Sequence, residues 1–116
     1  MMKKNMGSGH MSAKLEYRKQ EICVLLDGEI DHHAASLLRV SIDNAVLRKR
    51  PRLLILDFGA VTFMDSSGIG LVMGRYKLLR TVGGRLRVQN LSPAAYKVMR
   101  LAGLDKLGEL RQKEVV

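Results

Sequence analysis

The chain has 116 residues, which is enough for one hydrophobic core but short for two domains. Hydrophobic residues make up 47% of the chain and charged residues 27%, a composition typical of a folded globular domain rather than of a disordered one. No apolar run reaches the roughly 18 residues of a membrane-spanning helix, and the first residues contain no secretory apolar segment. We therefore expect a cytoplasmic protein that does not contact a membrane.

The formal net charge of +9 makes nucleic-acid binding a hypothesis to consider. The densest basic run, at residues 48–52, falls where a helix is expected to stop, so its cations complement the carboxyl end of the helix dipole. Aromatic residues total only 4%, with no Trp, which leaves few surfaces on which bases could stack. We expect no direct nucleic-acid binding, and the positive charge suits an acidic protein partner instead.

Two features near the N-terminus bear on domain organisation. Residues 7–11 read Gly-Ser-Gly-His-Met, which is typical of an expression leader joined to a native start, so we set residues 1–11 aside and assign residues 12–116 to one domain. Cys23 is the only cysteine, which excludes an internal disulfide and a multi-cysteine metal site. Its apolar neighbours predict a buried strand position and a structural role for the thiol.

The first half of the remaining chain predicts a hairpin followed by a helix. Residues 15–18 and 22–26 read as two short strands around a polar turn. Residues 27–30 are expected to break the second strand, after which Asp31 can cap a helix. Apolar residues recur at helical spacing over residues 34–46, and Pro51 predicts the end of that helix.

The next segment predicts a buried strand and a second helix. The apolar run at residues 53–56, closed by Asp57, is typical of a central strand buried on both faces. Residues 61–64 are expected to be a short connection or an edge segment. An apolar stripe then follows helical spacing over residues 69–79, and Gly70 and Gly74, one turn apart, predict a helix face that approaches a sheet closely.

The last part predicts one more strand and helix before the end of the chain. Residues 86–89 alternate apolar and polar side chains, and Ser92-Pro93 is the preferred order for a helix start. Gly103 is expected to stop this helix, and residues 104–110 to form a last short strand. The apolar side of the helix is predicted from four residues: Tyr96, Val98, Met99 and Leu101.

The order of these elements predicts one α/β domain with a mostly parallel sheet, an antiparallel N-terminal edge and helices packed against it.

Ser66 lies where an apolar segment meets the start of the second predicted helix, within the stretch at residues 63–70. A serine there can simply cap the helix, which is the plainest interpretation. A helix N-terminus also accommodates a phosphate, because its N–H groups are unpaired and the dipole is positive there. With Asp65 adjacent, and Asp31 near if both loops share one end of the sheet, a phosphate on Ser66 would create a strongly negative point that repels some partners.

Four segments together resemble the STAS-domain anti-sigma factor antagonists, and among them the anti-sigma F factor antagonists of endospore-forming bacteria. They are Gly28-Glu29-Ile30-Asp31-His32-His33, the stretch at residues 63–70, Gly74-Arg75-Tyr76-Lys77 and Ser92-Pro93, and the likeness extends from about residue 15 to residue 110.

The resemblance implies a phosphorylation switch at Ser66. A partner that is both a serine kinase and an anti-sigma factor would phosphorylate Ser66; the unphosphorylated protein would bind that partner and free a sporulation sigma factor, and a phosphatase would reset the serine. The protein would then be no enzyme and hold no cofactor or metal of its own, because the kinase supplies the ATP or ADP.

The same resemblance implies the partner-binding residues. Asp31 matches an acidic position near the phosphoacceptor, implicated in partner or nucleotide contact. Ser67, Gly68, Ile69 and Gly70 match the helix-start surface that faces the kinase, and we add Asp65 beside them.

Three alternatives remain open from the residues. A related stress-response sigma pathway would use the same switch. A receiver-like domain would be phosphorylated on Asp57, with Asp27 and Glu29 as possible Mg²⁺ ligands, but no Lys follows the strand at residues 86–89. A hydrolase would use Ser66 as nucleophile and His32 or His33 as base, although the glycines of a nucleophile elbow are missing.

Overall fold

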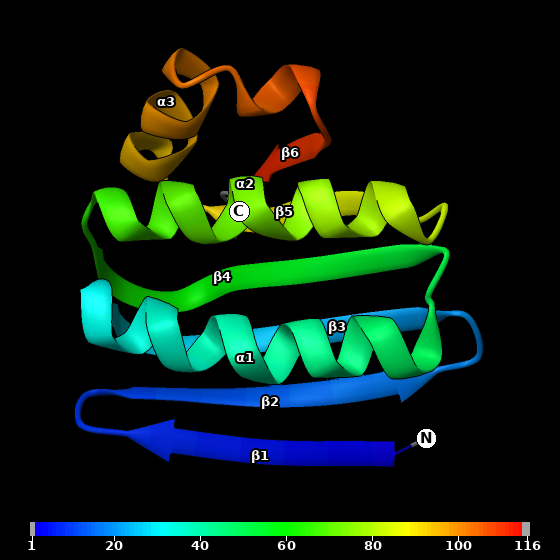
Figure 1. Cartoon of the computed structure of the whole chain (residues 1–116). Helices are drawn as coiled ribbons and strands as arrows, with labels where there is room; N and C mark the ends of the chain where they lie inside the picture. The colour runs from blue at the N-terminus through cyan, green and yellow to red at the C-terminus, as the bar shows by residue number, and fades with distance from the viewer. Residues whose placement is uncertain (1, 115–116) are drawn as a thin grey trace.

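The computed structural model describes residues 2–114, which build one six-stranded mixed sheet whose strands lie in sequence order (Figure 1). The strands are β1 (Met2–Ser8), β2 (Met11–Arg18), β3 (Glu21–Ile30), β4 (Leu53–Met64), β5 (Arg85–Leu91) and β6 (Glu109–Gln112). β1, β2 and β3 pair antiparallel, whereas β3, β4, β5 and β6 pair parallel. The predicted mixed sheet with an antiparallel N-terminal edge is confirmed.

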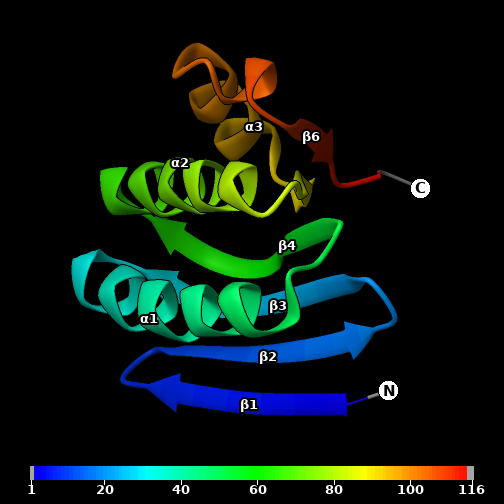
Figure 2. The ribbon, with the colours of Figure 1, turned by 45° about the vertical axis from the view of Figure 1, so that its right-hand side comes forward.

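The helices are α1 (His32–Lys49), α2 (Ser66–Thr81), α3 (Pro93–Leu101) and the short 3-10 helix η1 (Leu104–Lys106). α1 and α2 lie side by side over one face of the sheet (Figure 1), and α3 lies beyond β5, next to β6 (Figure 2). The core fills the space between α1, α2 and the sheet. Its fully buried members include Leu38 and Ile42 of α1, Leu54 and Leu56 of β4, and Leu79 of α2.

The ends of α1 follow the sequence signals closely. Asp31 caps its start, because the Asp31 carboxylate accepts a hydrogen bond from the Ala34 N–H at 2.8 Å. At its end, Arg50 adopts the left-handed conformation with φ of 46° and donates its N–H to the Val46 carbonyl. Arg48 and Lys49 occupy the last turn, so the basic run complements the helix dipole as predicted.

The segment that was set aside as a leader takes part in the sheet. Residues Met2–Ser8 form β1 and pair with β2 along their whole length, and Met11 is buried. These residues therefore add a strand to the sheet of the domain assigned at residues 12–116, because the edge of β2 offers N–H and C=O groups that a further strand can satisfy. Their origin as an expression leader stays a prediction.

The polar residues at positions 27–30 predicted a break in β3, and this prediction is wrong. β3 continues to Ile30, with register shifts against β4 between Leu25 and Asp27 and between Gly28 and Glu29. Gly28 makes this possible, because its φ is 95° and a Cβ there would lie 1.9 Å from the His10 carbonyl oxygen. The bulges keep the strand paired while it passes the turn between β1 and β2.

β4 is one long strand with two differently paired halves. Residues 61–64, predicted as a connection or an edge segment, continue β4 and pair with β3 through Met64. The pairing of β4 with β5 ends at Asp57, opposite Gln89. Residues 61–64 therefore form an edge, because they pair with β3 on one side and with no described strand on the other, although the first half of β4 lies in the centre of the sheet.

Three further expectations are corrected. Gly70 and Gly74 do not face the sheet, because a Cβ built on either would meet no atom within 4 Å. Residues 104–110 form η1 and only the start of β6 rather than one strand. On α3, Met99 is buried, but Val98 and Leu101 are exposed.

Within the part of the chain that the structure describes, no helix combines the length and the hydropathy that crossing a bilayer requires.

Candidate functional site

The starts of α1 and α2 lie side by side at one edge of the sheet. Ile30 and Met64 are the last paired residues of β3 and β4, and the Asp65 N–H donates to the Ile30 carbonyl oxygen at 3.3 Å. The residues that follow, Asp31 and Asp65, are the N-caps of the two helices, which both begin at the left in Figure 1. The expectation that these two loops share one end of the sheet is confirmed.

Asp65, and not Ser66, caps α2. The Asp65 carboxylate accepts a hydrogen bond from the Ser67 N–H at 2.8 Å, and Asp65 has the extended backbone of an N-cap residue. Ser66 is the first helical residue and is exposed. Among residues 2–114, no hydrogen-bond partner lies within reach of its hydroxyl. The interpretation of Ser66 as the cap is therefore wrong, and its oxygen faces solvent without a structural task.

The residues after Ser66 differ in exposure: some pack against the sheet and others face solvent. Gly68 is buried, and a Cβ there would lie 2.3 Å from the Met64 Cγ, so any larger residue requires the Met64 side chain at the end of β4 to move. Gly70 is exposed, whereas Ser67 and Ile69 are half-buried. Of the predicted partner-binding residues, Asp31 and Gly70 therefore offer the most surface, whereas Asp65 is half-buried.

The helix start and the two acidic caps set the electrostatics of this edge. The positive end of the α2 dipole lies next to Ser66 and stabilises an added anion, although the Ser67 N–H already donates to the Asp65 carboxylate and the Gly68 N–H to the Asp65 carbonyl oxygen. Asp31 and Asp65 already carry negative charge on the neighbouring caps. A phosphate on Ser66 would add about −1.5 to −2 charges beside them, so the edge would change from mildly to strongly acidic without any change in backbone.

A groove of about 500 Å³ opens beside Ser66. Its walls come from the second half of β4, the first turn of α2, the end of β5, the first turns of α3 and the residue that follows β6. The lining residues are Phe58, Gly59, Val61, Thr62, Phe63, Met64, Asp65, Ser66, Ile69, Asn90, Ser92, Ala94, Ala95, Val98 and Lys113. The sequence analysis missed this groove; its only signal is the pair of apolar segments at residues 61–64 and 94–98.

Comparison with known proteins identifies the fold family. A family model described as the STAS domain matches residues 13–115. The chain belongs to the STAS-domain family. This STAS domain is 32% identical over 106 residues to the anti-sigma F factor antagonist of Paenibacillus polymyxa, and the alignment covers 91% of each chain. It therefore belongs among the anti-sigma factor antagonists of that family.

Two solved structures agree with this assignment. The anti-sigma factor antagonist SpoIIAA in its unphosphorylated form superposes on this STAS domain with a TM-score of 0.75 and 36% identity, covering 84% of this chain and 86% of that one. The Bacillus cell fate determinant SpoIIAA in its phosphorylated form superposes with a TM-score of 0.71 and 36% identity, covering 84% and 89%.

Asp57 has a structural task in this STAS domain. Its carboxylate accepts hydrogen bonds from the Gly59 N–H at 2.9 Å, the Gln89 side-chain amide at 2.9 Å and the Asn90 side-chain amide at 2.8 Å. These bonds hold the end of β5 to the middle of β4. In the described part of the chain, no three His, Cys, Asp or Glu side chains are grouped so that they could hold a metal ion.

His32 and His33 lie exposed in the first turn of α1, and neither makes a described hydrogen bond to Ser66. The arrangement thus lacks the hydrogen-bonded base that a serine nucleophile requires.

Cys23 lies half-buried on β3 opposite Ile55, and burial raises the pKa of its thiol to about 11. The thiol is therefore protonated at neutral pH, in line with the structural role predicted for it.

Proposed function

We propose that this STAS domain is a phosphorylation-regulated antagonist of an anti-sigma factor, with Ser66 as the phosphorylated residue. The observation that carries the proposal is the exposed Ser66 at the first position of α2, whose hydroxyl makes no described hydrogen bond and which follows Asp65 at the edge of the sheet where Asp31 also lies. A hydroxyl that stabilises nothing can be modified at little cost to the fold. Membership among the anti-sigma factor antagonists supplies the class of partner.

The chain acts as a substrate and a ligand, and the partner kinase supplies the ATP, metal and base. The Ser66 Oγ attacks the γ-phosphorus in line, the bond from that phosphorus to the bridging oxygen breaks, and ADP leaves. The hydroxyl proton passes to the base of the kinase. This STAS domain therefore needs no cofactor, and its contribution is to hold the serine accessible on a rigid helix start.

The unphosphorylated protein binds the anti-sigma factor, which then releases its sigma factor. Phosphorylation places the new charge beside Asp31 and Asp65, so an acidic partner surface is repelled. A serine phosphatase reverses the step by hydrolysis of the phosphoester. The similar TM-scores to the unphosphorylated and phosphorylated forms of SpoIIAA support a switch that acts through charge rather than through refolding.

The residues around Ser66 divide the work of binding. Asp31, Asp65 and Gly70 form the surface that the kinase approaches, while Ser67, Gly68 and Ile69 keep the start of α2 in place. Glycine at position 70 leaves space next to the phosphoacceptor, because no atom lies within 4 Å of the place of its missing Cβ.

We assign the protein to a sporulation sigma pathway, since the relative from Paenibacillus polymyxa is an anti-sigma F factor antagonist. The experiment is to incubate it with ATP and, separately, with anti-sigma F and anti-sigma B kinases, and to locate the phosphate by mass spectrometry. Phosphate on Ser66 with the anti-sigma F kinase supports the assignment. Transfer by the anti-sigma B kinase alone would move the protein to the stress-response pathway.

The neighbouring hydroxyl provides a matched control. Ser66→Ala should bind the kinase without accepting phosphate, whereas Ser67→Ala should still be phosphorylated. Ser66→Asp should bind more weakly than the wild type, although one carboxylate charge is a poor copy of a phosphate. Phosphate on the Ser66→Ala protein, or base-labile phosphate on Asp57, contradicts the proposal.

A further inference from the structure

We propose that the groove beside Ser66 receives an extended, acidic segment of the anti-sigma partner, which adds as a strand along the free edge of β4 and places apolar side chains in the groove. The inference rests on the proposed function and identifies where, beyond the start of α2, the partner binds.

The edge of β4 that borders the groove has no neighbouring strand. β4 pairs with β3 through Met64, but β5 leaves it after Asp57. Asn90, in the left-handed conformation with φ of 56°, turns the chain out of β5 toward α3, and the Asp57 carboxylate fixes that turn through Asn90 and Gln89. Peptide groups on such an edge can pair with another chain, and proteins that recognise extended peptides use edges of this kind.

The groove is apolar at the place where the side chains of an added partner strand would bind. Phe63 and Val98 face it from β4 and α3, and both are largely exposed, at 50% and 48%. Leu101, three residues after Val98 on α3, is 78% exposed and extends the same stripe. Exposed apolar residues that gather around one groove are typical of a binding site.

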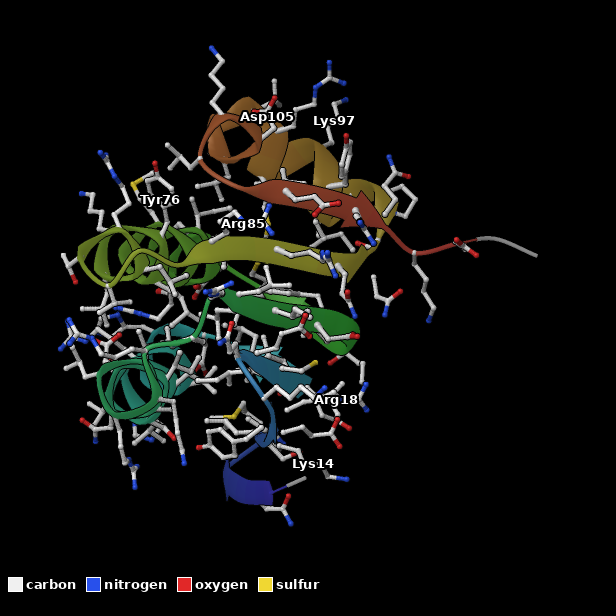
Figure 3. All side chains as sticks on the ribbon, turned by 90° about the vertical axis from the view of Figure 1, so that its right-hand side faces the viewer. Lys14, Arg18, Tyr76, Arg85, Lys97 and Asp105 are labelled. Carbon is white, nitrogen blue, oxygen red and sulfur yellow. The ribbon has the colours of Figure 1, made fainter. Side chains whose placement is uncertain are left out.

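Charge differs between the two sides of the groove: Asp65 lies beside Ser66, whereas Lys113 lies on the side of β6 and favours acidic residues of an occupant there. Lys113 lines the groove and is held there because its N–H donates to the Leu91 carbonyl oxygen at 2.8 Å. Lys97 is exposed on α3, which lies above β5 in Figure 3, and it directly precedes Val98 in the chain. The chain as a whole carries a net charge of +9, which attracts an acidic segment over longer distances.

Ser66 and Asp65 form part of the wall of the groove, so the groove and the switch are one surface. A phosphate on Ser66 would bring its charge directly against an acidic segment bound there. Phosphorylation would thus release the segment by repulsion and need not move any element of the fold.

The first test compares two valines of similar exposure on different helices. Val98→Asp places a charge in the groove, whereas Val40→Asp places it on α1, where Val40 is 55% exposed and outside the groove. We expect Val98→Asp to weaken binding of the unphosphorylated protein to the anti-sigma F kinase by roughly tenfold or more, and Val40→Asp to change it less than about twofold. Both variants should keep the circular dichroism spectrum and unfolding midpoint of the wild type.

The second test follows amide hydrogen exchange of the complex. Added strand pairing predicts slower exchange at residues 60–63 of β4 when the kinase binds, in the wild type but not in Val98→Asp. Protection confined to the starts of α1 and α2 would overturn the proposal. So would a change in self-association of Val98→Asp in sedimentation, which would assign the groove to a second copy of the chain.

The two proposals fail in distinguishable ways. If Ser66 accepts phosphate but Val98→Asp binds the kinase like Val40→Asp, the groove proposal is wrong and the switch stands. If no kinase phosphorylates Ser66, the proposed function itself fails.

Discussion

The two halves of β4 show how one strand can serve both the core and the site. Residues 53–57 have strands on both sides, and Leu53, Leu54, Ile55 and Leu56 are buried. Residues 58–64 have a strand on one side only, and Thr62 and Phe63 are exposed along the groove. The apolar residues of the first half therefore all lie in the core, whereas the second half contributes Phe58 to the core, positions Ser66 and leaves an edge open beside it.

The two halves of β4 differ because β5 pairs with only the first of them. β5 is held to β4 up to Asp57 and then turns away at Asn90. Since α3 starts right after β5, it forms the far wall of a groove in place of the next strand. The groove beside Ser66 thus exists because a neighbouring strand stops pairing before β4 ends.

The largest difference between the halves should appear in stability. Leu56→Ala removes a fully buried side chain and is expected to lower the free energy of unfolding by about 2–5 kcal/mol. Phe63→Ala, in the open half, should cost less than about 1 kcal/mol, because half of its side chain is already in water. Urea unfolding of both variants measures the contrast, and equal losses would show that the open half also belongs to the core.

The junction between the halves can be tested at Asp57. Asp57→Ala leaves the Gly59, Gln89 and Asn90 donors without their acceptor, so we expect a loss of about 1–3 kcal/mol in the free energy of unfolding. Asp27→Ala, at an exposed position of β3, should change it by less than about 0.5 kcal/mol. A loss for Asp57→Ala as small as for Asp27→Ala contradicts its role in fixing the turn of β5.

Two glycines of α2 should respond in opposite directions. Gly68→Ala forces the Met64 side chain from its place and is expected to destabilise the domain by about 1–3 kcal/mol. Gly70→Ala meets no atom within 4 Å and should stabilise the free protein by about 0.5–1 kcal/mol through helix propensity. Thermal unfolding measures both, and a stabilising Gly68→Ala would mean that the contact with β4 is loose.

The two residues that follow β4 should differ in their effect on stability, because Asp65 caps α2 and Ser66 does not. Asp65→Ala removes the N-cap of α2 and should cost about 1 kcal/mol, whereas Ser66→Ala should change stability by less than about 0.5 kcal/mol. Chemical denaturation distinguishes the two substitutions. If Ser66→Ala costs as much as Asp65→Ala, the hydroxyl has a structural partner and is less free for a kinase.

The smallest effect concerns Cys23, which lies opposite Ile55 on the buried half of the strand. Because burial raises the thiol pKa to about 11, little thiolate is present at pH 8. A thiol reagent at that pH should react with the folded protein roughly tenfold or more slowly than with the protein in urea. Equal rates would place the thiol in a more open environment.

The sequence alone predicted the order of the elements from β2 onward, and it is the source of the proposal that Ser66 is phosphorylated. Asp31, Pro51 and Ser92-Pro93 signal helix ends through short-range hydrogen bonds and backbone limits that depend only on neighbours in the chain. The apolar run at residues 53–56 likewise predicts a central strand, because burial on both faces requires it. Ser66 is proposed as the phosphorylated residue because residues 63–70 resemble a family pattern, not because a helix start is by itself a site.

Which faces of the helices and strands are buried by other segments follows only from the tertiary structure. Gly70 and Gly68 are both glycines in the first turns of α2, but Gly68 alone approaches β4. Val98 and Met99 are both apolar residues of α3, yet one faces the groove and the other is buried. The period of a helix or strand specifies which residues share a face, but contact with that face depends on segments distant in the chain, here β1, β4 and the turn at Asn90.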